Sequence, residues 1–212
     1  MYNTHWLKIF SQRTRIVLFL FAIAIVSSCS SKHVFSKYEK ELIHQEAENT
    51  PFRVLQITNP EDSVLLRTLC SDVDIASRDL GVFINRLKAT LISENGVGIA
   101  APQVGILKNV FLFMRSESPE TIVVAINPRI VNHPGETICF ERDGCLSIPG
   151  VAGNSIRYPW IEVEYYNEEG ILIREKLEGY SRKTGFTAIV FQHEYDHLQG
   201  VLFTDKLCDT LN

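Results

Sequence analysis

The 212-residue sequence lacks several features that would set it apart from ordinary globular proteins. Its longest apolar run, residues 16–26, has 11 residues, whereas a helix needs about 20 to cross a bilayer. Basic residues are not in excess, because 21 Lys+Arg stand against 25 Asp+Glu and give a net charge of −4, so we expect no nucleic-acid partner. Five scattered cysteines are too few for a disulfide framework. A hydrophobic fraction of 45% excludes disorder and predicts one folded core.

The first 28 residues have the pattern of a secretory signal. Residues 1–15 carry Lys8, Arg13 and Arg15 and no acidic residue, the short apolar run follows, and Ser27 and Ser28 precede Cys29. This order resembles a bacterial lipoprotein signal, which is cut before a cysteine that then carries lipid. Cleavage would leave 184 residues with a net charge of −7, since the removed segment holds three basic and no acidic residues. The alternatives are an uncleaved membrane anchor or a buried N-terminal helix.

This signal predicts an exported protein attached to a membrane through lipidated Cys29, on the periplasmic or cell-envelope side, with a cytoplasmic protein as the alternative. Residues 29–50 are mostly polar and are expected to form a tether between the membrane and a folded domain over residues 51–212. The alternative for this segment is a short amphipathic helix through Tyr38, Leu42 and Ile43.

Hydrophobic periodicity predicts an α+β fold. Helical spacing of apolar residues predicts an amphipathic helix over residues 78–94, with Ser77 as N-cap and Asn95-Gly96 as the stop, and a second helix over residues 185–198. β-rich runs predict strands over residues 110–114, 122–126, 161–166 and 171–176, the last two joined by a hairpin loop at residues 167–170. Strands and helices do not alternate regularly, which favours α+β over a doubly wound sheet.

The strongest chemical signal lies in the second helix. In His193-Glu194-Tyr195-Asp196-His197 the two imidazoles are four residues apart, on one helix face, where both can bind one metal ion. Glu194 can then reach a metal-bound water as general base and general acid. The alternative is a chance match on a helix whose histidines are core residues.

The third metal ligand decides the kind of site. Downstream of His197 the chain offers only Asp205 and Asp209, without the glutamate or histidine of ordinary zinc proteases. The best candidate is upstream, Cys145, which follows a glycine that permits close approach of the backbone to a metal. One cysteine and two histidines leave a fourth tetrahedral position open, as in catalytic sites.

Three motifs together resemble the peptide deformylases. They are Gly96-Val97-Gly98-Ile99-Ala100-Ala101-Pro102-Gln103, then Gly144-Cys145-Leu146-Ser147, then Gln192-His193-Glu194-Tyr195-Asp196-His197-Leu198, and the resemblance extends over about residues 54–207. It implies antiparallel sheets around a central C-terminal metal-binding helix. It also implies hydrolysis of the N-formyl group of formyl-methionyl peptides, with release of formate.

The resemblance also implies residue roles. Cys145, His193 and His197 would hold a divalent metal, iron(II) in this family with zinc, nickel or cobalt as replacements, and Glu194 would be the general acid and base. The amide of Gln103 and the backbone N–H of Leu146 would stabilise the oxyanion.

The same resemblance suggests how substrate is held. The backbone of Gly98 and Ile99 would pair with an extended peptide. Ile189 and Val190 would line a slot for the methionine side chain, although plain core packing explains them equally well.

Two departures leave questions open. Asp143 stands where the family usually has glutamate, which shortens a carboxylate behind the ligands by one methylene. An exported location is also unusual for an enzyme of nascent chains, and because oxidation threatens iron(II) outside the cytoplasm, we predict zinc or another robust ion in the native site.

Other assignments have alternatives. Asp196 either orients an imidazole such as His197 or bonds backbone or an arginine. Cys70, Cys139 and Cys208 are either inert thiols or contain a disulfide pair that the sequence does not identify. The alternative functions are a non-catalytic peptide-binding lipoprotein and, less favoured, a metalloprotease.

Overall fold

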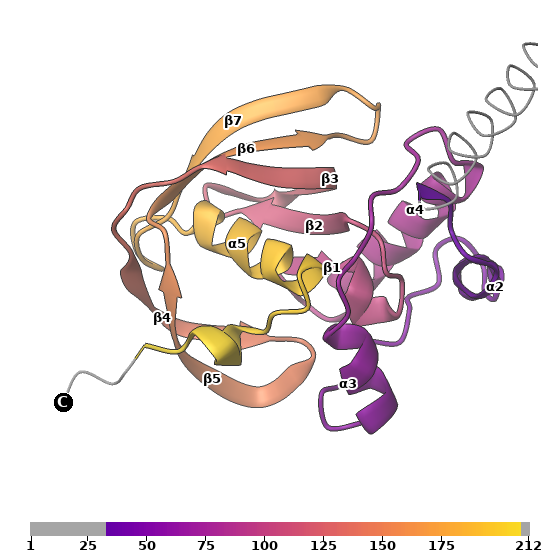
Figure 1. Ribbon diagram of the computed structural model, residues 1–212, viewed down its shortest axis with the longest axis horizontal. Helices are drawn as coiled ribbons and strands as arrows, with labels where there is room; N and C mark the ends of the chain where they lie inside the picture. The colour runs from indigo at the N-terminus through magenta and orange to yellow at the C-terminus, as the bar shows by residue number, and fades with distance from the viewer. Residues whose placement is uncertain (1–32, 209–212) are drawn as a thin grey trace, which may run out of the picture. The chain divides into compact units, whose positions relative to one another are not determined.

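Helix α5 (Thr187–Leu198) lies between two antiparallel sheets. The structure is a computed structural model and describes residues 33–208 (Figure 1). Figure 1 shows α5 with a five-stranded sheet on one side and a two-stranded sheet on the other. This confirms the predicted α+β architecture around a C-terminal helix. The predicted signal over residues 1–28 and its lipidation site Cys29 lie outside the described residues.

The five-stranded sheet has the order β1-β2-β3-β6-β7. Its strands are β1 (Gly98–Ala100), β2 (Val110–Arg115), β3 (Ser118–Asn132), β6 (Trp160–Tyr166) and β7 (Leu172–Glu178). Strands β2, β3 and β6 each contain a predicted strand, and β7 overlaps the prediction over residues 172–176. The short β1 at the edge was not predicted, because three residues are too few for an alternating pattern.

Strand β2 is apolar along its length because both of its faces are covered. Phe111 and Phe113 point to α5, where Phe191 packs edge-on with ring centroids 4.8 and 5.4 Å away. Val110 and Leu112 belong instead to the core cluster under helix α4. Side chains alternate between the faces of a strand, so a strand with two covered faces reads as a continuous apolar run.

Helix α4 (Arg78–Ser93) matches the predicted amphipathic helix. The apolar residues of the predicted face are buried: Leu80, Phe83, Ile84, Leu87 and Leu91. The chain leaves the helix through Asn95 at φ 52°, in the left-handed region, and the Gly96 N–H returns to the Leu91 carbonyl at 3.1 Å. This is the stop predicted from Asn95-Gly96, and it directs the chain into β1.

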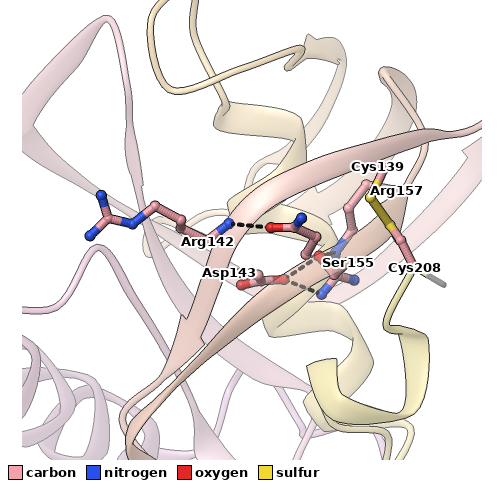
Figure 2. The surroundings of a disulfide bond; sticks show 7 residues. Cys139, Arg142, Asp143, Ser155, Arg157 and Cys208 are labelled. Carbon is pink, nitrogen blue, oxygen red and sulfur yellow. Dashed lines mark hydrogen bonds and ion pairs between the residues drawn. A yellow bond between two sulfur atoms is a disulfide. The ribbon is translucent and has the colours of Figure 1, made fainter. Parts of the chain in front are cut away.

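The two-stranded sheet consists of β4 (Ile138–Cys145) and β5 (Ile148–Arg157). A disulfide joins Cys139 on β4 to Cys208 (Figure 2). The Cys208 N–H also donates to the Asn154 carbonyl at 2.8 Å, and Leu207 bridges to Ser155. The open disulfide question is therefore answered by the Cys139–Cys208 pair. Cys70 remains a buried free thiol, and burial raises its pKa to about 12.

The expected tether needs correction over its second half. Residues 35–50 belong to the folded unit, and the alternative amphipathic helix is what forms, as α2 (Lys37–His44). Ser36 caps this helix by accepting from the Glu39 N–H. Ile43 is fully buried and Tyr38 is 60% exposed. Two apolar side chains on one turn of a polar segment are a weak signal, but Arg86 fixes the helix end by donating to the Leu42 and Ile43 carbonyls.

Two further short elements complete the fold. Helix α3 (Pro60–Leu66) begins at Asn59, whose side chain accepts from the Glu61 and Asp62 N–H groups. The 3-10 turns are η2 (Ala101–Val104) and η3 (Phe203–Lys206). Among residues 33–208, no helix is long and apolar enough to cross a membrane.

Candidate metal centre and active site

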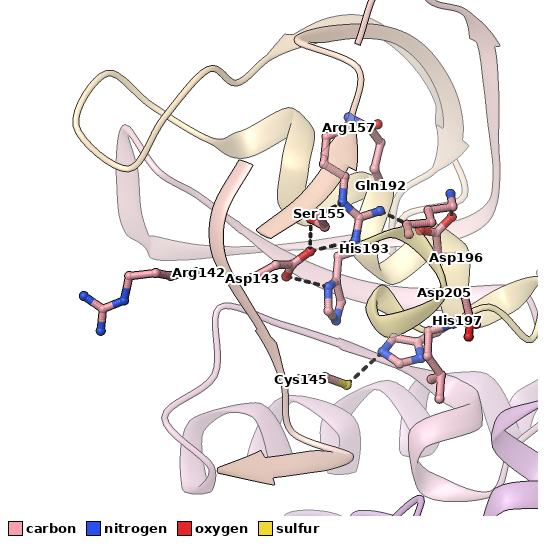
Figure 3. Close-up of polar contacts among 12 residues, drawn as sticks. Arg142, Asp143, Cys145, Ser155, Arg157, Gln192, His193, Asp196, His197 and Asp205 are labelled. Carbon is pink, nitrogen blue, oxygen red and sulfur yellow. Dashed lines mark hydrogen bonds and ion pairs between the residues drawn. The ribbon is translucent and has the colours of Figure 1, made fainter. Parts of the chain in front are cut away.

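Cys145, His193 and His197 converge as the motifs predicted. Cys145 ends β4, and the two histidines lie one turn apart on α5. One ligand atom from each residue lies within 4.8 Å of the other two, and the Cys145 Sγ and His197 Nε2 are 3.3 Å apart (Figure 3). A thiolate and two imidazoles at this spacing suit a tetrahedral divalent ion with one position left for water. The residues present therefore fit a catalytic metal.

Asp143 fixes the orientation of His193. Its Oδ1 lies 2.9 Å from His193 Nδ1, which leaves Nε2 on the side of the other ligands. Its Oδ2 accepts from Ser155 Oγ at 2.6 Å and from Arg157 Nη2 at 2.8 Å. Although burial opposes it, the hydrogen bond and charge of His193 and the charge of Arg157 hold the pKa of Asp143 below its usual value. The shorter carboxylate thus still reaches the imidazole directly.

Arg157 ties the β4–β5 sheet to α5 behind the ligands. Its side chain is 1% exposed and lies between Asp143 and Asp196, with Nη1 donating to Asp196 at 2.6 Å. Lys206 approaches the other Asp196 oxygen at 2.6 Å. Of the two alternatives for Asp196, the structure shows the arginine partner. The Nδ1 of His197 has no hydrogen-bond partner among the described residues.

Glu194 is 3% exposed and lines the same cavity as Cys145 and His193. Its Oε2 has no hydrogen-bond partner within the described part of the chain. Burial raises the pKa of this carboxyl to about 8, and the charge of Asp143 adds to the rise. A Cβ at Gly98 would overlap the Glu194 carboxylate, so glycine at this position allows β1 to pass close to it.

Gln103 is held so that its amide nitrogen faces the ligands. Its Oε1 accepts from the Ala100 N–H at 2.8 Å, and its Nε2 lies 3.2 Å from Ser147 Oγ and 3.5 Å from Cys145 Sγ. Leu146 also lines the cavity, and its carbonyl accepts from Gln56 Nε2 at 3.1 Å. Sequence reasoning missed Gln56, which no motif surrounds.

The edge of β1 is formed by Gly98 rather than by Ile99. Because the Val97 carbonyl accepts from the Met114 N–H, residues 97 and 99 turn their backbone groups to β2, and Gly98 turns its groups to the free edge. Ile99 is fully buried opposite Leu112 and does not line the cavity. The structure thus brings Gly98 to the predicted site and leaves Ile99 in the core.

The cavity has a volume of about 320 Å³. Ile189 and Val190 line it one turn before His193, as predicted, although each is more than nine-tenths buried. The other apolar walls are Phe140 on β4 and Phe186 before α5, and Arg182 lies at the same cavity. Sequence reasoning missed Phe140 and Arg182, because they belong to a strand and a loop without a recognisable pattern, and it placed Phe186 on the face of the predicted helix without assigning it to the cavity.

Comparison with known proteins agrees with this geometry. The polypeptide deformylase family model matches residues 52–211. A peptide deformylase of Acetivibrio thermocellus is 40% identical over 143 residues, which cover 68% of this chain and 78% of that protein.

Solved structures give the same result. The crystal structure of peptide deformylase from Thermotoga maritima has a TM-score of 0.65 at 35% identity and covers 75% of this chain and 99% of that chain. The class I type b peptide deformylase of Acinetobacter baumannii with Met-Ala-Ser bound has a TM-score of 0.64 at 30% identity, with 75% and 99% covered. A family match over three quarters of the sequence, joined to the Cys-His-His cluster, shows that the chain belongs to the polypeptide deformylase family.

Proposed function

We propose that the protein hydrolyses the N-formyl amide of formyl-methionyl peptides with one divalent metal held by Cys145, His193 and His197. The observation that carries this proposal is that the three ligands converge beside a cavity that two of them, Cys145 and His193, line together with Glu194 and Gln103. A bound divalent ion supplies Lewis-acid chemistry, which polarises a carbonyl and makes water acidic. Water adds to the formyl carbon, the C–N bond breaks, and formate and a free amine leave.

Glu194 moves the proton in this reaction. Its buried carboxyl has a pKa of about 8, and a nearby cation lowers the pKa of a carboxyl towards neutrality. With a pKa near neutrality, the carboxylate can accept a proton from the attacking water and return it to the leaving nitrogen. Its unpartnered Oε2 supports this role.

Gln103 and Leu146 stabilise the negative charge that develops on the formyl oxygen. The Gln103 Nε2 is directed by the bond from the Ala100 N–H to Oε1, and the Leu146 carbonyl, next to the N–H that would donate, accepts from Gln56. Donors fixed before the reaction need no reorganisation, and losing one typically costs about 10²–10³ in rate.

The substrate lies along β1 with its first side chain in the cavity. The backbone groups of Gly98 at the free sheet edge pair with an extended peptide. Gly98 and Ile99 were both predicted to bind the peptide, but Ile99 contributes only by fixing β1 to β2. Ile189 and Val190 contact the methionine side chain. Binding of Met-Ala-Ser to the Acinetobacter baumannii relative supports a peptide in this place.

The proposal for the native metal follows from the proposed location of the protein outside the cytoplasm. Family resemblance favours iron(II), with nickel or cobalt as replacements, but iron bound to a thiolate oxidises readily outside the cytoplasm. We therefore propose zinc or another robust ion in the native site. Element analysis of protein recovered from its own membrane tests this, and iron at full occupancy with activity stable in air would contradict it.

The amino terminus is proposed to be a lipoprotein signal that is cut before Cys29 and leaves the domain attached to the outer side of a membrane. The basic, apolar and small-residue order of residues 1–29 supports this. Mass spectrometry of the protein from the membrane fraction should find lipid on Cys29 and none on a Cys29→Ser variant. An intact Met1 in soluble protein would instead indicate a cytoplasmic enzyme.

The decisive assay compares formylated, acetylated and free peptides of one sequence. We expect formate from the formylated peptide alone, in protein loaded separately with iron(II), nickel and zinc. Binding without turnover at full metal occupancy would indicate a peptide-binding protein, and internal cleavage would indicate a protease. Intact Glu194 and Gln103 favour the first outcome, because a binding protein needs neither.

A further inference from the structure

Arg182 stands at the cavity in a fixed position although its side chain is exposed. It belongs to the connection between β7 and α5. Its guanidinium carbon lies 5.4 Å from the Phe140 ring and 5.5 Å from the Phe186 ring, and both rings also line the cavity. Its Nη2 donates to the Arg142 carbonyl at 2.5 Å. Two rings and a carbonyl from β4 therefore hold the guanidinium at this place.

The charge of Arg182 has no carboxylate partner among residues 33–208. Six other arginines do: Arg53, Arg67, Arg115, Arg129, Arg157 and Arg174. Arg142, whose backbone Arg182 contacts, is likewise without an ion pair in the described residues, and Figure 3 shows its side chain pointing away from the Asp143 network. The carboxylates that line the cavity are Asp143, already bonded to His193 and Arg157, and Glu194.

The charge of Arg182 is opposite in sign to the net charge of the whole chain. The chain has a net charge of −4, so its overall field repels acidic peptides. Arg182 at the cavity can attract a peptide carboxylate in spite of this repulsion, but only when the carboxylate comes close enough to bind the guanidinium. The apolar walls Ile189, Val190 and Phe186 suit an uncharged first side chain, which places such a carboxylate further along the peptide.

We propose that Arg182 is a specificity-determining residue that favours formylated peptides carrying a carboxylate downstream of the first residue. The carboxylate is either an acidic side chain or the terminal carboxylate of a short peptide, since both present the planar acceptor that a guanidinium binds through two hydrogen bonds. This inference rests on the proposed function, because it concerns the same cavity.

The test compares peptides that differ by one charge. The metal-loaded full chain is assayed with formyl-Met-Ala-Glu amide and formyl-Met-Ala-Gln amide, and with the free-acid form of the latter. Because Arg182 is exposed, we expect kcat/KM to be only about two- to fivefold higher for each peptide with a carboxylate. The difference should come from a lower KM, and it should decrease with added salt.

Matched variants separate charge from structure. Arg182→Gln should bring the ratio to about one by lowering kcat/KM for the carboxylate peptides more than for the neutral peptide, while Arg182→Lys should keep part of the preference. Arg174→Gln removes one positive charge from β7 outside the cavity and should keep the full preference. A wild-type ratio near one, or an equal loss for all peptides in Arg182→Gln, would overturn the proposal.

A binding measurement keeps the inference distinct from the proposed function. Calorimetry with the products Met-Ala-Glu amide and Met-Ala-Gln amide reads the same preference without turnover. If the neutral formyl peptide is not hydrolysed, the proposed function fails, and the affinity ratio in wild type and Arg182→Gln still decides the role of Arg182. Equal affinities in the wild type would overturn it.

Discussion

Asp143 carries more of the site than its place outside the ligand set suggests. Its two oxygens connect His193 to Arg157 and Ser155, and Arg157 continues to Asp196. Charges this deeply buried are stable only when paired, so removal of one leaves its partners uncompensated. The family's usual glutamate is longer by one methylene, yet the aspartate makes all of these contacts.

Replacement of Asp143 by Asn should weaken metal binding. The change removes the negative charge between His193 and Arg157, and loss of a partner behind a metal ligand typically costs about 10- to 100-fold in metal affinity. Competition with a chelator measures the affinity. Asp143→Glu is the control and should remain within a few-fold of the wild type. Equal affinity in Asp143→Asn and the wild type would show that Asp143 does not orient the ligand.

Asp62, which is not a metal ligand, provides a pH-dependent contribution to stability. Its carboxylate accepts from Arg53 at 2.7 and 2.8 Å and from the Gln56 N–H at 2.9 Å. The hydrogen bond from Arg53 lowers the pKa of Asp62, while burial opposes it. Because the folded-state pKa lies below the unfolded value of about 4, the contribution is complete above that value and is lost as the pH falls through the folded-state pKa.

We therefore expect Asp62→Asn to lower the free energy of unfolding by about 1.5–3 kcal/mol at pH 7. The difference from the wild type should shrink towards pH 3. Urea unfolding of metal-free protein at both pH values measures it, with exposed Glu61→Gln as the control, which should change little. The same difference at both pH values would show that the charge of Asp62 is not the cause.

At the scale of elements, the predictable ones are those whose residues form a pattern by themselves. Helix α4 shows its buried face in the spacing of Leu80, Phe83 and Leu87, and β2 shows its burial on two faces as an apolar run. Strands β4 and β5 show neither, since they contain charged residues and glycines and form mainly by pairing with each other. The ligands were predictable because each of them lies in a short motif that is local in sequence.

The residues that support the ligands were not predictable, because none of them lies in a local motif. Gln56, Arg182 and Lys206 reach the site through tertiary contacts, without a motif around them. The segment of helix α2 was expected to be part of a tether, because the buried face of this helix is small and is covered by packing against α4.

The Cys139–Cys208 disulfide should stabilise the β4–β5 sheet and the segment after η3. It links residues 69 apart, and cross-links of this kind typically contribute about 2–4 kcal/mol. We expect a Cys139→Ser, Cys208→Ser double variant to unfold at lower urea concentration by that amount. A dithiol reductant should shift the wild type to the same midpoint and leave the double variant unchanged. Equal midpoints for the oxidised wild type and the double variant would contradict this contribution.

At the scale of the whole molecule, the two sheets bring distant parts of the sequence to one helix. β1 supplies an open sheet edge, β4 supplies Cys145, and α5 supplies both histidines and Glu194. The aromatic contacts of Phe191 with β2 hold α5 in place, and Arg157 connects it to the second sheet. The catalytic account depends on this rigid frame, because its groups come from three elements, β1, β4 and α5.

The central claim is that Glu194 carries out proton transfer at a metal held by Cys145, His193 and His197. The most direct measurement is formate release by Glu194→Gln loaded with metal and compared with the wild type at equal metal content. We expect bound metal to be unchanged and kcat to fall by at least about 10²-fold, because the amide cannot accept the proton. Turnover within a few-fold of the wild type at full metal occupancy would contradict the account.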